Sequence, residues 1–390
     1  MNRNKGVTGP KGFQAAGVAA GIKESGALDL ALVVNEGPRQ DAAGVFTTNQ
    51  VKAAPVLWSQ QVVKERRLRA VVLNSGGANA CTGPEGFQDT HATAEKVADV
   101  LAVGAIEVAV CSTGLIGERL PMDNLKAGVD KAVAELATGD QAGLNAATAV
   151  MTTDTRPKQS HAVHADGWSV GGFVKGAGML SPNMATMLSV ITTDAVVDGA
   201  ALDAALRAVT ARTYDRLDVD GGTSTNDTVL LLASGASGVT PSDEDFRAVL
   251  TQVAADLVKQ LQGDAEGVTK EVSITVNGAL SEDEAVVVAK TVAEDNLVKT
   301  ALFGSDPNWG RIAMAVGRSK ATVDQDLLGI TINGVTLFEK GHKAADRSEA
   351  DLSGRDVAIV IDLNLGDGGA TVLTTDLSHD YVEENSAYSS

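Results

Sequence analysis

"KGAGMLSPNMATMLSVITTDA" (175–195) joins a glycine-containing turn to an apolar run that begins directly after Thr186. Runs of Leu, Val, Ile and Thr are typical of a β-strand, and a strand can begin with Thr. The preceding residue, Ala185, is small and leaves room for a hydroxyl to attack its carbonyl. Gly176 and Gly178 allow the close backbone approach that such an attack needs. The stretch therefore has two interpretations: a strand entered through a turn, or a strand whose first residue is freed by cleavage of the Ala185–Thr186 bond.

A threonine at a chain terminus would carry its own catalytic base. An α-amino group has a pKa of about 7.7–8.0, so its neutral form can take the proton of the threonine hydroxyl near neutral pH. In self-cleavage, the hydroxyl attacks the preceding carbonyl, an ester forms, and water releases the new amine. The sequence offers no other evident base, because the five histidines lie scattered in polar contexts and no HExxH or GxSxG motif occurs.

Composition limits the classes of function. The chain has 390 residues, which favours two domains or one two-lobed fold, and its 44% apolar but 3% aromatic content indicates a core of Ala, Val and Leu. The formal net charge of -18 opposes binding to nucleic acid or to an anionic membrane. No apolar run is long enough to span a bilayer. We expect a cytoplasmic protein in which Cys81 and Cys111 are buried free thiols.

Strand and helix patterns are mixed along the whole chain. This mixture predicts an α/β or α+β fold with layered sheets. Strand-like runs that end in small or polar residues occur at 28–35, 69–77 and 105–114, and further strands are expected at 228–234, 272–277, 329–334 and 356–366. Helices are expected at 123–136, 199–213, 242–262 and 281–300.

Two loops after strands are candidates for an oxyanion hole. In "VAVCSTGLIG" (108–117), a strand runs into Thr113 and Gly114, where backbone N–H groups and a hydroxyl can point outward together. "NSGGANACTG" (74–83) has the same character, and either loop can equally be an ordinary glycine turn. His161 and His164 are three residues apart, but their context indicates a hairpin, so we expect no metal site.

The central stretch resembles the signature of ornithine acetyltransferases (glutamate N-acetyltransferases) of the cyclic arginine pathway. Other segments resemble the same family in the family's order, so that the resemblance covers essentially the whole chain. These segments are "VTGPKGFQAAGVAAGIK" (7–23), "VVLNSGGANACTG" (71–83), "CSTGLIGERLP" (111–121), "MTTDT" (151–155), "DGGTSTNDTVLLLASG" (220–235), "FGSDPNWGRI" (303–312) and "YVEENSAYSS" (381–390).

The resemblance implies a fold and a set of site residues. The implied fold is a layered αββα sandwich with a smaller C-terminal portion, similar to N-terminal nucleophile hydrolases but distinct in topology. Cleavage between Ala185 and Thr186 would give an α chain (1–185) and a β chain (186–390) that ends in a lid, assembled as α2β2. The nucleophile falls on Thr186, and the oxyanion hole falls on Thr113 and Gly114. Substrate contacts fall on Thr152, Lys175, Thr186, Glu266, Asn385 and Ser390.

The implied reaction is a ping-pong transfer of acetyl from N2-acetyl-L-ornithine to L-glutamate, with no cofactor. Use of acetyl-CoA as a second donor stays open. A hydrolase that passes the acyl group to water is one alternative, and a binding protein with an inert Thr186 is another. A third alternative is a paralogue that serves a specialised-metabolite pathway.

Overall fold

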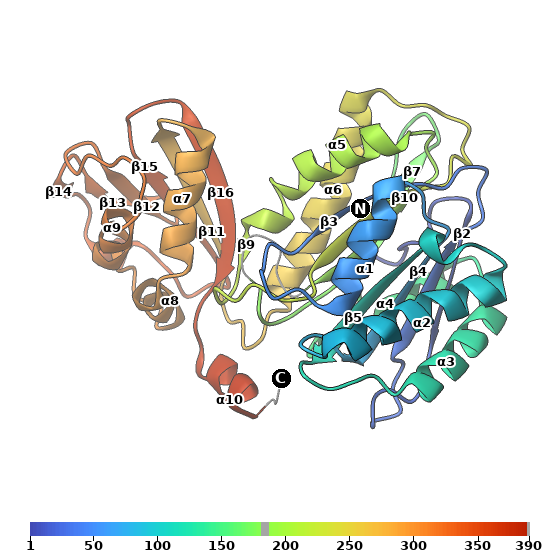
Figure 1. Cartoon of the computed structure of the whole chain (residues 1–390). Helices are drawn as coiled ribbons and strands as arrows, with labels where there is room; N and C mark the ends of the chain where they lie inside the picture. Colours follow the sequence, from blue (N-terminus) through green and yellow to red (C-terminus); the bar gives the residue numbers. More distant parts are fainter. Residues whose placement is uncertain (181–186, 388–390) are drawn as a thin grey trace.

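Two stacked sheets form the larger lobe of the molecule, which the computed structural model describes over residues 1–180 and 187–387 (Figure 1). One sheet has the strand order β1-β2-β4-β5, and the other has the order β3-β10-β8-β7-β6. The strands of the first sheet are β1 (Phe13–Val18), β2 (Leu30–Asn35), β4 (Ala70–Gly77) and β5 (Val108–Leu115). Those of the second are β3 (Asp41–Phe46), β6 (Lys158–Val163), β7 (Ser169–Lys175), β8 (Leu188–Thr193) and β10 (Thr228–Ala233).

Helices cover the outer face of each sheet. α2 (Gly83–Leu101) and α3 (Met122–Ala134) pack on the first sheet, and α5 (Gly199–Thr210) and α6 (Asp243–Gly263) pack on the second. Buried side chains of both sheets meet between them, where α4 (Asp140–Ala149) adds alanine side chains. A further helix, α1 (Ala54–Val62), packs against β5. The lobe is therefore layered helix, sheet, sheet, helix, with its core built mainly from Ala, Val and Leu.

The central strand β8 lies directly after the predicted cleavage point. It pairs antiparallel with β7, with Lys175 opposite Leu188, and parallel with β10. Every residue of β7 and β8 is buried, which agrees with the near-continuous apolar run that the sequence shows there. The segments on both sides of the predicted cleavage point are thus built into the middle of one sheet.

The smaller lobe is C-terminal and has a sheet of its own. Its strand order is β14-β13-β12-β15-β11-β16-β9, and helices on the sheet enclose a separate apolar core. β9 (Leu217–Asp218) precedes β10 in the chain, so it links this sheet to the larger lobe. The other strands are β11 (Glu271–Ala279), β12 (Gly329–Ile332), β13 (Val335–Glu339), β14 (His342–Lys343), β15 (Asp356–Asp362) and β16 (Gly368–Thr375). The helices are α7 (Glu282–Ala293), α8 (Asn296–Phe303), α9 (Trp309–Gly317) and the C-terminal α10 (His379–Ala387).

Side-chain caps set the starts of several helices. The Ser242 hydroxyl accepts a hydrogen bond from the Asp245 N–H at the start of α6, and Ser281 accepts one from the Glu284 N–H at the start of α7. The expectation of one helix over 281–300 was wrong, because α7 ends at Ala293. Asp295 then accepts hydrogen bonds from the first N–H groups of α8. An acidic residue inside a helical pattern acts here as a cap, which periodicity alone does not distinguish.

The layering, four strands and the two cysteines can be compared directly with what the sequence predicts. The mixed α/β fold with layered sheets and a smaller C-terminal portion is confirmed, as are strands near 28–35, 69–77, 105–114 and 228–234. Cys111 is a buried free thiol as expected, but the expectation for Cys81 was wrong, because its side chain is exposed in the loop after β4.

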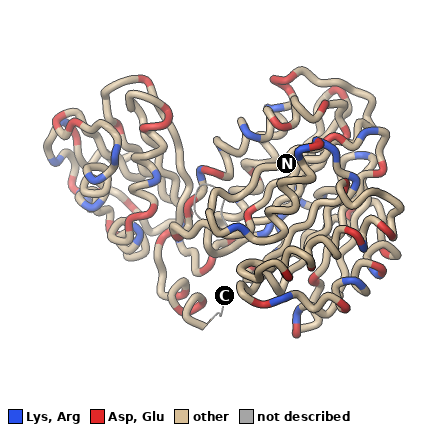
Figure 2. Tube along the Cα trace, in the orientation of Figure 1, with Lys and Arg blue, Asp and Glu red and all other residues tan. Residues whose placement is uncertain are grey.

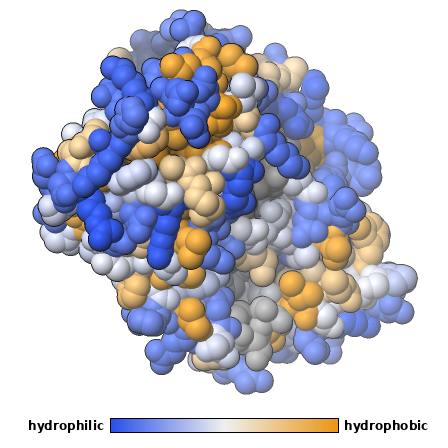
Figure 3. All heavy atoms as spheres, turned by 90° about the vertical axis from the view of Figure 1, so that its left-hand side faces the viewer, coloured by the Kyte–Doolittle hydropathy of each residue, from blue (hydrophilic) through white to orange (hydrophobic). Residues whose placement is uncertain are grey.

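The surface carries mixed charge. Lys and Arg are spread over both lobes among Asp and Glu (Figure 2). On the face seen from the side of the smaller lobe, hydrophilic residues predominate and hydrophobic ones form separate patches (Figure 3). Within the described ranges, no helix is both long and apolar enough to cross a bilayer.

Candidate active site

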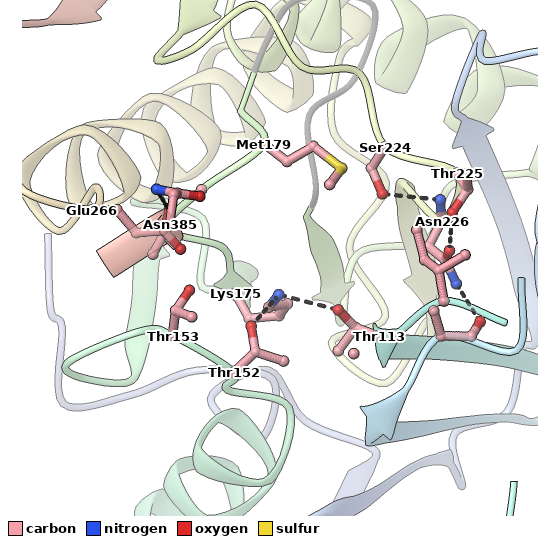
Figure 4. A pocket seen from close by; sticks show the side chains of 15 residues that line it. Thr113, Thr152, Thr153, Lys175, Met179, Ser224, Thr225, Asn226, Glu266 and Asn385 are labelled. Atoms are coloured by element: carbon pink, nitrogen blue, oxygen red, sulfur yellow. Dashed lines mark hydrogen bonds between the residues drawn. The ribbon is translucent and has the colours of Figure 1, made fainter. Parts of the chain in front are cut away.

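A pocket lies where the ends of β5 and β7 meet the loops before β10 and after α6. It encloses about 120 Å³ and is lined by residues from widely separated parts of the chain (Figure 4). The lining residues are Ala78, Thr113, Gly114, Ile116, Thr152, Thr153, Lys175, Ala177, Gly178, Met179, Ser224, Thr225, Asn226, Glu266 and Asn385. The structure therefore brings together six residues that the sequence singled out: Thr113, Gly114, Thr152, Lys175, Glu266 and Asn385.

Three of the predicted residues lie outside the described ranges. They are Ala185, Thr186 and Ser390. The nearest described neighbour of Thr186 in the chain is Met187, whose backbone N–H donates a hydrogen bond of 2.9 Å to the Asp227 carboxyl. Asp227 is completely buried, and burial raises its pKa well above the usual range for Asp. A buried acidic side chain thus holds the first residue after the proposed nucleophile.

Lys175 is the last residue of β7, and its side chain is 1% exposed. Its ammonium lies between two hydroxyls, donating to Thr152 Oγ1 at 2.8 Å and to Thr113 Oγ1 at 3.2 Å (Figure 4). Burial lowers the pKa of Lys175, and the nearby Asp154 carboxylate opposes that shift. A lysine at the end of a buried strand therefore connects two loops of the pocket.

Asp154 supports this arrangement from behind. Its Oδ1 accepts hydrogen bonds from the Gly176 N–H at 2.7 Å and from Lys158 Nζ at 2.5 Å, and its Oδ2 accepts one from the Thr152 N–H at 3.0 Å. Burial alone would raise the pKa of Asp154, but the ammonium groups of Lys175 and Lys158 outweigh it and lower that pKa. Lys158 also pairs with Asp264 at 2.6 Å, so both of these buried carboxylates have an ammonium partner.

Gly114 has a conformation that a larger residue cannot adopt there. Its φ is +130°, and a Cβ atom would lie 2.5 Å from the backbone nitrogen of Gly77. β5 pairs in parallel with β4 up to this point, where the register shifts between Gly76 and Gly77. The two strand ends are therefore packed backbone against backbone, and the expected loops 74–83 and 108–117 lie together rather than forming two separate sites.

Asn226 fixes this region from the opposite side of the pocket. Its Nδ2 donates to the carbonyl oxygens of Ala78 at 2.7 Å and Ser112 at 2.8 Å. One amide thus holds both strand ends, and it orients the peptide units around Thr113. Asn226 lies in the family-like segment 220–235, but the sequence predicts no role for it, because nothing in the sequence places it beside β4 and β5.

Glu266 follows α6 and lies on the other side of the pocket. Its N–H donates to the Ala177 carbonyl at 3.0 Å, and its Oε2 accepts a hydrogen bond of 2.9 Å from Asn385 of α10 (Figure 4). Gly178 makes room for the carboxylate, since a Cβ at this position would lie 2.1 Å from Glu266 Oε2. The C-terminal helix is thereby connected to the pocket.

Asp220 makes a second connection to α10. Its Oδ2 accepts hydrogen bonds from the Met179 N–H at 2.6 Å and from the Tyr381 hydroxyl at 3.3 Å. Met179 has a φ of +55°, a left-handed conformation that these bonds help to hold. Burial raises the pKa of Asp220. Sequence reasoning missed Asp220, because its partners are about 40 and 160 residues away along the chain.

In the described part of the chain, no three His, Cys, Asp or Glu side chains are grouped so that they could hold a metal ion. His161 and His164 lie on the β6–β7 hairpin, as expected. His161 is buried in β6, and His164 stacks on Trp168.

Comparison with known proteins gives a consistent result. The model of the ArgJ family matches residues 14–390. A Mycolicibacterium paratuberculosis relative, "Arginine biosynthesis bifunctional protein ArgJ", is 63% identical over 100% of this chain and 97% of its own. A Streptomyces coelicolor relative of the same name is 59% identical over 98% of this chain and 100% of its own. A crystal structure of ornithine acetyltransferase with ornithine from Mycobacterium tuberculosis is 66% identical, covering 48% of this chain and 98% of that one with a TM-score of 0.46.

Proposed function

Because this chain belongs to the ArgJ family, we propose that it transfers acetyl from N2-acetyl-L-ornithine to L-glutamate through an acyl-enzyme on Thr186. The broader role rests on relatives that match over the full length: the protein is an acetyltransferase of arginine biosynthesis. The observation that carries the finer proposal is the pocket. Six of the residues that the family resemblance implies, drawn from four separate segments and α10, line one small cavity.

The first half-reaction begins with a proton transfer within Thr186. Its α-amino group takes the hydroxyl proton while Oγ attacks the acetyl carbonyl. The tetrahedral oxyanion would accept hydrogen bonds from the Gly114 N–H and the Thr113 hydroxyl. The C–N bond then breaks, and the ornithine nitrogen leaves with the proton from the Thr186 amine. Acetyl remains on Thr186 as an ester.

The second half-reaction reverses these roles. The neutral amine of glutamate attacks the ester carbonyl, the same donors hold the oxyanion, and Thr186 Oγ leaves with a proton. An ammonium has three N–H donors, of which Lys175 uses two on threonine hydroxyls, so one is left for a substrate carboxylate. Glu266 is suited to a substrate amine, and Asn385 orients its carboxylate.

We also propose how the chain is cleaved, how it assembles and where it is located. Self-cleavage would give chains 1–185 and 186–390, assembled as α2β2, and the two free thiols support a reducing, cytoplasmic location. Acetyl-CoA would be a second donor that forms the same acyl-enzyme on Thr186. The polar pocket needs no bound group for the steps above, because acetyl passes directly between amino acids.

The test follows both products with acetyl-labelled N2-acetylornithine. We expect labelled acetylglutamate only when glutamate is present, and loss of transfer in Thr186→Ala. Thr186→Ser is the matched variant, because it keeps the hydroxyl and should retain transfer. Labelled acetate formed at the same rate with and without glutamate would indicate a hydrolase instead. Wild-type transfer by Thr186→Ala would contradict the proposal, and acetyl-CoA assayed in parallel tests the second donor.

A further inference from the structure

The ammonium of Lys175 has an unusual set of neighbours. Among the described residues, its hydrogen bonds go to the hydroxyls of Thr152 and Thr113, and no carboxylate lies within ion-pair distance. Its side chain is buried at the pocket wall rather than extended into solvent. Two of its three N–H donors are therefore satisfied by threonine oxygens before any ligand binds.

The bond to Thr113 determines what that hydroxyl can do. Lys175 has no acceptor in its charged form, so Thr113 Oγ1 must be the acceptor of this bond. The hydroxyl hydrogen of Thr113 is then directed elsewhere, and no described residue accepts it. Thr113 faces the pocket in Figure 4, so this hydrogen is available to a ligand there. The positively charged ammonium that donates to this oxygen also makes the hydroxyl a stronger donor.

Asp154 holds the two ends of this arrangement together. It binds the N–H of Thr152 and the N–H of Gly176, the residue next to Lys175. Its direct ion pair is with Lys158, at 2.5 Å, while Lys175 hydrogen-bonds to the two threonine hydroxyls at the pocket wall. All three charged side chains are nine-tenths or more buried, where electrostatic effects are larger than at a surface.

We propose that Lys175 is a positioning residue that orients the Thr113 hydroxyl toward the developing oxyanion, with Asp154 holding the backbone on both sides. The inference deepens the proposed function and rests on Thr113 being an oxyanion donor. It adds to the substrate contact of Lys175, because it predicts that Lys175 matters even for a donor that has no carboxylate.

The test uses p-nitrophenyl acetate, a donor with neither carboxylate nor amine. Acetyl moves to Thr186 Oγ and nitrophenolate leaves, so the burst of nitrophenolate reports formation of the acyl-enzyme. We expect Lys175→Met to slow the burst by about as much as Thr113→Val, on the order of 10²-fold, the effect of losing one oxyanion donor. The double variant should be no slower than either single variant, because both remove the same interaction. Lys175→Arg, which keeps a cation, should recover part of the rate.

Two results would overturn the inference. One is a wild-type burst in Lys175→Met together with lost activity on acetylornithine, which would leave Lys175 as a carboxylate contact only. The other is a double variant slowed by the product of the single effects. If Lys175→Met remains uncleaved, the same variants are made by co-expressing residues 1–185 with 186–390, so that Thr186 is supplied as an N-terminus.

Failure of the proposed function would look different. It would show as no burst in the wild-type protein, or as a wild-type burst in Thr186→Ala. Circular dichroism and intact mass of each variant separate a lost interaction from a lost fold. Thr155→Val is a matched control near the same buried charges, because its hydroxyl bonds to Asp264 and not to Lys175.

Discussion

At the scale of single residues, the site depends on backbone positions that few side chains could occupy. Gly114 has a left-handed φ and touches the backbone of the neighbouring strand, while Gly178 leaves space for Glu266. Around them, the buried Asn226 amide donates two hydrogen bonds and the half-buried Asp220 carboxylate accepts several. Burying a polar group without a hydrogen-bond partner costs free energy. Conformations that break these bonds are therefore disfavoured, and the bonds hold the pocket in one geometry.

Gly114→Ala tests the strand end. A methyl group would meet the Gly77 nitrogen, and φ would remain strained, so the Gly114 N–H should move out of line with the oxyanion. We expect kcat to fall by about 10²–10³-fold, the cost of one oxyanion donor. Gly117→Ala is the matched control, because Gly117 also has a positive φ, +90°, but no atom lies within 4 Å of its Cβ position. Steady-state kinetics measure kcat for both variants. An equal fall in kcat in Gly114→Ala and Gly117→Ala would contradict a specific role for Gly114.

At the scale of elements, the C-terminal helix α10 lies on the surface and is held by a few hydrogen bonds. None of its residues is buried, and its described connections to the pocket are the Asn385–Glu266 and Tyr381–Asp220 hydrogen bonds. A helix of nine residues is marginal by itself, so these contacts and the Ser378–Gly267 bond hold it in place. If α10 is the lid that shields an acyl-enzyme from water, weakening these contacts should send more of the acyl group to water.

Tyr381→Phe should loosen that lid without changing its shape. One hydrogen bond is worth about 0.5–1.5 kcal/mol, so the helix should open severalfold more often. We expect the ratio of labelled acetate to acetylglutamate to rise severalfold, while acylation by p-nitrophenyl acetate stays within twofold. Val382→Ala, an exposed position on the same helix, is the control and should leave the ratio unchanged. An unchanged ratio in Tyr381→Phe would argue that α10 does not exclude water.

At the scale of the whole molecule, the proposed cleavage divides a sheet. β7 would belong to chain 1–185 and β8 to chain 186–390, yet the two strands pair from Val170 opposite Thr193 to Lys175 opposite Leu188. β3 and β10 form a second ladder between the same two chains. The two chains would thus share the core between the sheets as well as the pocket.

The two chains should therefore remain together after cleavage. We expect one species at or above the 39.9 kDa of the full chain under native conditions, and two fragments only after denaturation. Native and denaturing mass spectrometry measure this on the wild-type protein and on Thr186→Ala, which should give a single 39.9 kDa chain in both. Fragments that separate in native buffer, or a wild-type chain that is never cleaved, would contradict the expectation.

The buried charges behind the pocket should also matter for stability. Lys158 has no exposed side-chain surface and pairs with Asp154 and Asp264, so Lys158→Met removes the nearest cation from two buried carboxylates. Breaking such a buried pair costs about 3–5 kcal/mol. Lys259→Met is the matched control: Lys259 pairs with Glu271 at the surface, where a pair is worth about 0–1 kcal/mol. Urea unfolding measures the free energy of unfolding of both variants in the Thr186→Ala background, where we expect a single chain. An equal loss of stability in Lys158→Met and Lys259→Met would contradict the role of burial.

The sequence alone indicated some elements reliably and others not. Apolar runs that end in polar or small residues located β2, β4, β5 and β10, because a buried strand leaves a pattern over consecutive residues. The helix expected at 281–300 was two helices, because Asp295 fits a helical pattern but acts as a cap. Local patterns report burial and periodicity, but they do not report which side chain accepts a bond from which N–H.

The family resemblance supplied Thr113, Gly114, Thr152, Lys175, Glu266 and Asn385, and only the tertiary structure gathered them around one pocket. It also decided the roles of Asn226, Asp154 and Asp220. Their partners come from distant segments, as in the bonds that Asn226 makes with Ala78 and Ser112. Composition, strand pattern and the motif around Thr186 are properties of neighbouring residues, so the sequence determined them. The hydroxyl that Lys175 holds, and the peptide that Asn226 fixes, depend on long-range packing that no local pattern encodes.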